Sequence, residues 1–201
     1  MKHPKAPLSR LSCAIAAAVM LMTAASSCTG DRNDSDRATS YGHRIAANLT
    51  NRDSLLQMRD QLSENENPDV RQRLYDLSCD STAHFQAAVM VLTMRPDQIA
   101  GIIVREPRTG LAAAVAGCYH LMGLDGEYAR LRDQTLKNFD GMDTASQAQL
   151  VTAIATPEQC AAAVQQGDDA LVREIRLHYK GTDSLRRFDS ALARNSAYDG
   201  H

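Results

Sequence analysis

Cysteine and histidine are the side chains in this sequence with the widest chemical range, because thiolates act as nucleophiles and imidazoles act as bases or metal ligands. Beyond residue 28 the histidines are His43, His84, His120, His178 and His201. No two of them have the i, i+4 spacing of a helical zinc site, and neither HExxH nor CxxC occurs. We therefore expect scattered surface histidines, with no metal site.

Three of the five cysteines, Cys79, Cys118 and Cys160, lie among apolar residues with helical spacing. A catalytic thiol needs a histidine within reach, and His120 is only two residues from Cys118, so the two would face different ways on a helix. We expect all three to be small buried hydrophobic residues. An odd number in an oxidising compartment would leave at least one thiol unpaired within the molecule.

Motifs for other chemistry are missing from the sequence. It contains no GxSxG, no glycine-rich phosphate loop and no dinucleotide fingerprint, so we expect no cofactor. Its many helical acids stand close to arginines, a pattern typical of a solvated helix face. The catalytic residues of an enzyme, if it is one, remain unknown at this level, and a dispersed pair of carboxylates stays open.

The six tyrosines are the best candidates for interface anchors, because tyrosine suits half-wet contact surfaces. The alternative for each is a core tyrosine with one hydrogen bond. They are Tyr41, Tyr75, Tyr119, Tyr128, Tyr179 and Tyr198.

The N-terminus has the order of an export signal. A basic start in residues 1–12 leads to a ten-residue apolar run, 13–22, and then to the small residues TAASS and Cys28. The run is too short to cross a bilayer, which needs about 20 apolar residues. A buried helix of the mature fold is the alternative.

The segment from Ala25 to Cys28 resembles the lipobox of bacterial lipoproteins, in which a cysteine follows three mostly small residues. The resemblance implies a signal peptide over residues 1–27, cut before Cys28, whose sulfur takes a diacylglycerol with fatty acids such as palmitate. The family usually has Leu at the place of Ala25 and Gly or Ala at that of Ser27. A plain signal cut in the AASS stretch, which would release the protein, is therefore the alternative.

Residues 28–40 are polar, rich in Asp and nearly free of apolar groups, so we expect a lipidated, disordered tether before a helical domain at 41–201. The early acids Asp31, Asp34 and Asp36 resemble the acidic stretch of surface-exposed Bacteroidetes lipoproteins. Together these features imply a bacterial cell-envelope protein held on a membrane, the outer membrane above all, by lipid on Cys28.

The overall charge excludes one class of partner. Without residues 1–27 the chain keeps 19 basic and 24 acidic side chains, a net charge near −5. Nucleic-acid binding needs a basic face that neutralises phosphates, so we expect no nucleic-acid partner. Attachment to a membrane would then have to come from the lipid.

The composition predicts an all-α protein. The chain has no Trp and only three Phe, and it is rich in residues that favour helix. Helix starts are indicated by Asn67 with Pro68, by Ser81 and by capping boxes at 144–147 and 156–159, and Gly123 indicates a stop. No strand signal competes. The expected architecture is an irregular helical bundle or a short α-solenoid of helical hairpins.

Two helical-repeat families are similar to parts of this chain. The stretch NPDVRQRLYDL, 67–77, resembles the second helix of a HEAT repeat, where Asp, Val and Arg recur in that order. Tyr119, Gly123 and Ala129 resemble the first helix and turn of a tetratricopeptide repeat. Each resemblance covers under 40 residues, and both imply stacked helices.

These features predict a lipid-anchored, non-catalytic envelope protein that binds or assembles another envelope protein. Two alternatives stay open. One is an envelope hydrolase with a dispersed carboxylate site, and the other is a lipoprotein that binds a small ligand between its helices.

Overall fold

The fold is all-α, as the sequence predicts. The computed structural model describes residues 28–198 except 107, 109 and 165–166, so the predicted signal peptide, 1–27, and His201 lie outside the described residues. Among the described residues no helix is both long and apolar enough to cross a membrane. The helices are α1 (Cys28–Ala46), α2 (Arg52–Glu64), α3 (Pro68–Cys79), α4 (Ala83–Thr93), α5 (Pro96–Arg105), α6 (Leu111–Met122), α7 (Asp125–Asn138), the 3-10 turn η1 (Phe139–Gly141), α8 (Thr144–Ile154), α9 (Pro157–Ala163), α10 (Asp169–His178) and α11 (Asp183–Tyr198).

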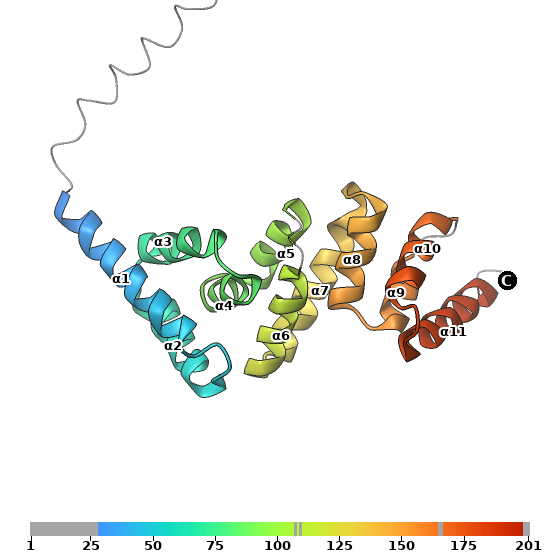
Figure 1. Cartoon of the computed structure of the whole chain (residues 1–201), viewed down its shortest axis with the longest axis horizontal. Coiled ribbons are helices and arrows are strands. Elements are labelled where there is room, and N and C mark those ends of the chain that lie inside the picture. Colours follow the sequence, from blue (N-terminus) through green and yellow to red (C-terminus); the bar gives the residue numbers. More distant parts are fainter. Residues whose placement is uncertain (1–27, 107, 109, 165–166, 199–201) are drawn as a thin grey trace, which may run out of the picture.

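The helices form an elongated array that runs from α1 at one end to α11 at the other (Figure 1). The even-numbered helices pack one on the next, α2 on α4, α4 on α6, α6 on α8 and α8 on α10. The odd-numbered helices pack instead in separate pairs, α1 with α3, α5 with α7 and α9 with α11. Packing of each helix on the next but one is typical of stacked helical hairpins, so the solenoid alternative describes the array better than a closed bundle.

Helix α4 lies at the centre of the N-terminal half. Its residues 86–92 are all buried, and the helix contacts α1, α2, α3, α5 and α6. Small side chains such as Ala87 and Ala88 on α4 and Ala114 on α6 let the two helices approach closely. The polar residue Gln86 is buried in this run, and its Oε1 accepts a hydrogen bond from the guanidinium of Arg108.

Several helix ends lie where the sequence predicts them. The Asn67 side chain accepts a hydrogen bond from the backbone N–H of Val70 at 2.8 Å, with Pro68 as the first helical residue of α3. The capping box of α9 joins Thr156 and Gln159. Gly123 ends α6 in the left-handed region at φ 70°, where a side chain would be strained.

Two predicted starts are off by one residue. The N-cap of α8 is Asp143, whose carboxylate accepts from the N–H of Ser146 at 3.0 Å, so the box expected from Thr144 is not formed. The N-cap of α4 is Thr82 and not Ser81. In both cases two neighbouring residues can cap, and the structure uses the second of them at α4 and the first at α8.

The prediction of a disordered tether at residues 28–40 is wrong, because α1 begins at Cys28. Residues near the middle of this helix dock on the domain: Ala38 is fully buried, and Arg37 forms an ion pair of 2.6 Å with Glu66 in the turn between α2 and α3. Composition alone missed this order, since a polar helix needs only a few docked side chains to be stable against its neighbour.

The Arg37–Glu66 ion pair gives a stability test. The Glu66 side chain is 1% exposed and that of Arg37 is 47% exposed, so Arg37→Ala leaves a buried carboxylate without its cation. We expect a loss of about 1–2 kcal/mol in the free energy of unfolding, since water reaches the open side of the pair. Chemical denaturation measures it.

The matched control is Arg32→Ala, which removes an exposed arginine from the same helix and should leave stability unchanged. Adding Glu66→Gln to Arg37→Ala should restore part of the loss, because the buried charge is gone. Equal stability of Arg37→Ala and Arg32→Ala would contradict the docking of α1 by this contact.

Candidate functional site

Cys79, Cys118 and Cys160 are free thiols. Cys118 and Cys160 are buried as predicted, whereas Cys79 at the end of α3 is partly exposed, so the prediction fails for that residue. Burial raises the pKa of the Cys118 thiol to about 11 and also raises the pKa of Cys160. Neither buried thiol has the depressed pKa of a nucleophile.

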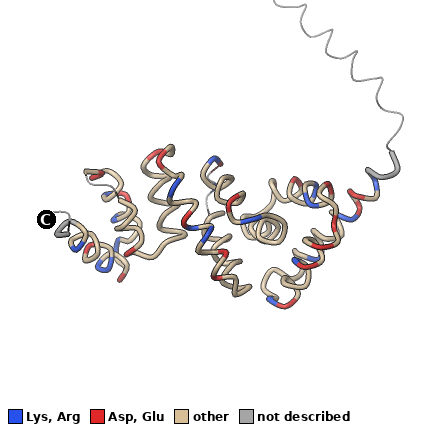
Figure 2. Tube along the Cα trace, turned by 180° about the vertical axis from the view of Figure 1, so that it is seen from behind, with Lys and Arg blue, Asp and Glu red and all other residues tan. Residues whose placement is uncertain are grey.

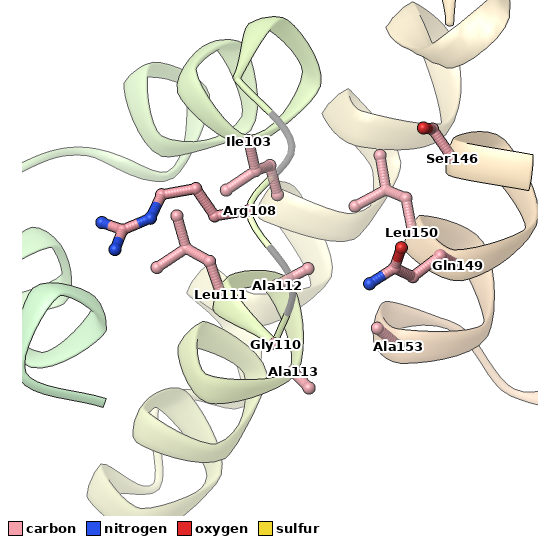
Figure 3. Close-up of a pocket in the computed structure, with 10 residues that line it drawn as sticks. All are labelled: Ile103, Arg108, Gly110, Leu111, Ala112, Ala113, Ser146, Gln149, Leu150 and Ala153. Atoms are coloured by element: carbon pink, nitrogen blue, oxygen red, sulfur yellow. The ribbon is translucent and has the colours of Figure 1, made fainter. Parts of the chain in front are cut away.

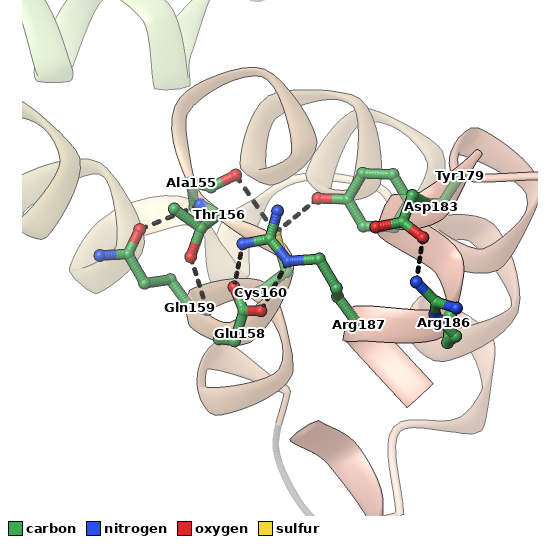
Figure 4. Close-up of polar contacts among 9 residues, drawn as sticks. All are labelled: Ala155, Thr156, Glu158, Gln159, Cys160, Tyr179, Asp183, Arg186 and Arg187. Atoms are coloured by element: carbon green, nitrogen blue, oxygen red, sulfur yellow. Dashed lines mark hydrogen bonds and ion pairs between the residues drawn. The ribbon is translucent and has the colours of Figure 1, made fainter. Parts of the chain in front are cut away.

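Cys160 belongs to a polar cluster that joins α9, α10 and α11 (Figure 4). Its Sγ lies 3.2 Å from the Tyr179 hydroxyl, and the Arg187 guanidinium forms two hydrogen bonds of 2.8 Å with the Glu158 carboxylate. These bonds lower the pKa of Glu158 to about 2, so the carboxylate stays ionised and cannot act as a general acid near neutral pH. The cluster fastens the last helices together.

The predicted histidines lie apart on the surface. His43, His84, His120 and His178 are exposed, and in the described part of the chain no three residues among His, Cys, Asp and Glu gather as metal ligands do. His120 has the most defined surroundings: its Nδ1 is 3.7 Å from Asp125, and its ring packs 4.5 Å from that of Tyr128. The side chains of His120 and Asp125 are both exposed.

The tyrosines divide between core and partly buried positions. Tyr119 and Tyr179 are buried, and Tyr41, Tyr75 and Tyr128 are partly buried, while the side chain of Tyr198 lies outside the described residues. The Tyr119 hydroxyl has no hydrogen-bond partner among the described residues, and burial raises its pKa. The partly buried tyrosines keep the half-wet position expected of interface anchors, and that role stays a prediction for them.

A small apolar pocket lies between α6 and α8 (Figure 3). Ile103, Leu111 and Ala112 line one side of it, and Leu150 and Ala153 on α8 line the other. Its volume is about 150 Å³. Ligand sites usually measure about 300 Å³ or more, so this pocket is too small for most cofactors and metabolites.

A groove of about 690 Å³, larger than the pocket between α6 and α8, is bordered by α2, α3 and α7 and by the junction of α4 with α5. We call it the arginine groove, because four arginines and two acids line it: Arg59, Arg71, Arg95, Arg130, Asp97 and Glu127. It lies where the odd-numbered layer is interrupted, since α3 packs on α1 and α5 packs on α7 without comparable packing between α3 and α5. The break in the layer is therefore the structural origin of the groove.

Both acids of the arginine groove are paired. Glu127 on α7 accepts hydrogen bonds of 2.6 Å at both carboxylate oxygens from Arg59 on α2, and Asp97 pairs with Arg95 at 2.7 Å. The bond to Arg95 lowers the pKa of Asp97. Two carboxylates that are each paired with an arginine are poorly suited to acid–base catalysis.

Two arginines of the groove have no such partner. Arg71 on α3 and Arg130 on α7 form no ion pair or hydrogen bond with the described residues. Along the whole array basic and acidic positions are interspersed (Figure 2), so the excess of arginine is a local property of the groove. Arginines of this kind are the side chains that pair most readily with anions.

The arginine groove was not predicted from the sequence. Its four arginines are spread over 72 positions of the chain in three helices and one turn, with no spacing that links them. The sequence shows only arginines within α2, α3 and α7 and just after α4, and such arginines are common on solvated helices.

Labelling of the cysteines tests their placement. With the full-length folded chain and a thiol reagent at pH 8, Cys79 should react first, and Cys118 and Cys160 should react slowly, because they are buried and stay protonated. Since the pKa of Cys118 is raised to about 11, its rate should keep rising with pH beyond the usual thiol range. Mass spectrometry of peptides measures each site.

The control is the unfolded chain, in which all three thiols should react quickly. Fast native labelling of Cys118 or Cys160 would overturn their assignment as packing residues and would favour an enzyme with a cysteine nucleophile.

The chain was compared with protein-family models, curated proteins and solved structures. No protein-family model, no curated protein and no solved structure matches this chain. Any inference about activity therefore depends on the residues of the array and of the arginine groove.

Proposed function

We propose that this chain is a lipid-anchored cell-envelope protein with a non-catalytic, protein-interaction or assembly role. The observation that carries the proposal is the elongated helical array with an open groove at a break in one layer. Stacked helical arrays offer long surfaces that bind protein partners.

The condition of the candidate reactive groups supports a binding role. The buried thiols have raised pKa values, and Glu158, Asp97 and Glu127 are held in ion pairs with arginines. A hydrolase that uses two carboxylates needs one of them protonated near neutral pH, and arginine pairing opposes that. The small pocket between α6 and α8 gives little support to a small-ligand binder.

The anchor in this proposal rests on the N-terminal sequence. A basic start, a short apolar run and small residues before Cys28 are the order of a lipoprotein signal. The remaining chain is acidic, so electrostatic attachment to anionic lipid is weak, and lipid on Cys28 would hold the protein at the bacterial outer membrane, on its periplasmic or its surface side.

Replacing Cys28 tests the anchor. Cys28→Ser removes the sulfur that would form the thioether, so we expect no lipid incorporation and no cleavage of the signal, with the uncleaved chain as the product. Metabolic labelling with a fatty acid and the mass of the purified protein measure both effects.

The matched control is Cys13→Ser, which changes a cysteine within the apolar run and should leave lipidation intact. Lipid on the Cys28→Ser protein, or a wild-type protein without lipid that a high-salt wash removes from membranes, would refute the anchor.

Crosslinking in intact cells tests the interaction role. A photo-reactive residue placed at Ser63 or Gln134, beside the arginine groove, or at Gln57, Arg105, Gln149 or Lys180 elsewhere on the array should give a discrete adduct with one envelope protein from a limited set of positions. Such a set would define a contact face. Absence of an adduct at every position would contradict a stable partner.

A further inference from the structure

We propose that the arginine groove binds an acidic peptide segment of a partner protein, whose carboxylates pair with Arg71 and Arg130. The proposal rests on the interaction role proposed above and adds the chemistry of the partner. It also assigns the contact face to the break between α3 and α5.

The charge of the groove is the first argument. Of its four arginines, Arg59 and Arg95 neutralise the two acids that line it, which leaves the charges of Arg71 and Arg130 uncompensated. Other acids of the same helices, among them Asp60 and Asp69, are exposed but do not line the groove. The chain without its first 27 residues is net acidic, so two unpaired arginines facing one groove are a local reversal of charge.

The shape of the groove is the second argument. It continues past Arg71 and Arg95 into a neighbouring hollow of about 290 Å³ that is also lined by Gln72 and Gln98. An open groove that continues into a second hollow suits an extended chain better than a compact ion. The Nε2 of Gln72 already donates to Asp76, and the Oε1 of Gln98 accepts from the backbone N–H of Arg95. The Oε1 of Gln72 and the Nε2 of Gln98 remain to hydrogen-bond a peptide backbone.

The floor of the groove is the third argument. The partly exposed Met94 and Pro96, at the junction of α4 with α5, contribute apolar surface to the groove, and the buried Val91 and Leu92 lie beneath them. Nucleic-acid phosphate or free phosphate would gain nothing from this floor, whereas a peptide with alternating acidic and apolar side chains would cover it. Guanidinium forks pair with carboxylates through two parallel hydrogen bonds, which fixes the register of such a peptide.

The test is fluorescence anisotropy of labelled peptides with the full-length chain in detergent. The probe is a Glu-rich peptide with interspersed Leu, and its control carries Gln at every Glu position. We expect the Glu peptide to bind, the Gln peptide to bind at least about tenfold more weakly, and added salt to weaken the binding.

Matched double variants locate the site. Arg71→Ser with Arg130→Ser should raise the dissociation constant of the Glu peptide about tenfold or more. Arg173→Ser with Arg194→Ser removes the same charge from exposed positions on α10 and α11 and should leave affinity within about twofold. Circular dichroism of both variants should match the wild type, since all four side chains project from the surface of the array.

Three results would overturn the proposal: no binding of the Glu peptide, equal binding of the Gln peptide, or equal losses in the two double variants. Binding to anionic phosphatidylglycerol vesicles that needs Arg71 and Arg130, without peptide binding, would also overturn it and assign the groove to a membrane. If crosslinking still yields one envelope partner while the Glu peptide fails to bind, only this inference falls, and the interaction role stands.

Discussion

The burial of α4 is the constraint on which the N-terminal half of the array depends. A helix with seven consecutive buried residues has no face that can meet water, so neighbours must enclose it on every side. Helices α1, α2, α3, α5 and α6 do so, and the approach of α4 to α6 is close because alanines lie between them. The one polar member, Gln86, is tolerated because Arg108 reaches it and also donates to the backbone carbonyls of Cys79 and Ser81.

Much of the fold could be predicted from local signals. Helix class followed from composition, and the ends of α3, α6 and α9 followed from Asn67, Gly123 and Thr156, whose capping chemistry acts within one turn. Local chemistry left a choice where two candidate caps adjoin, as at Asp143 and Thr144, because the packing of the whole helix selects between them.

The parts that could not be predicted depend on contacts between distant residues. The sequence predicts a disordered tether at residues 28–40 because their order depends on distant contacts. Ala38 is buried against the domain, and Arg37 pairs with Glu66. The arginine groove was invisible for the same reason. Whether an arginine is unpaired or forms an ion pair depends on acids that are distant in the sequence. Glu127, for example, lies 68 positions from its partner Arg59. A sequence shows the charges but not their pairing.

The break between α3 and α5 has a mechanical consequence. The even-numbered helices pack continuously along the array, while the layer of odd-numbered helices is interrupted between α3 and α5. We therefore expect the array to bend most easily at this interruption. The Arg59–Glu127 pair ties α2 to α7 across that opening and limits its width. Anything seated there would stiffen the array along its length, and a pull on either end would change how tightly the groove holds its occupant.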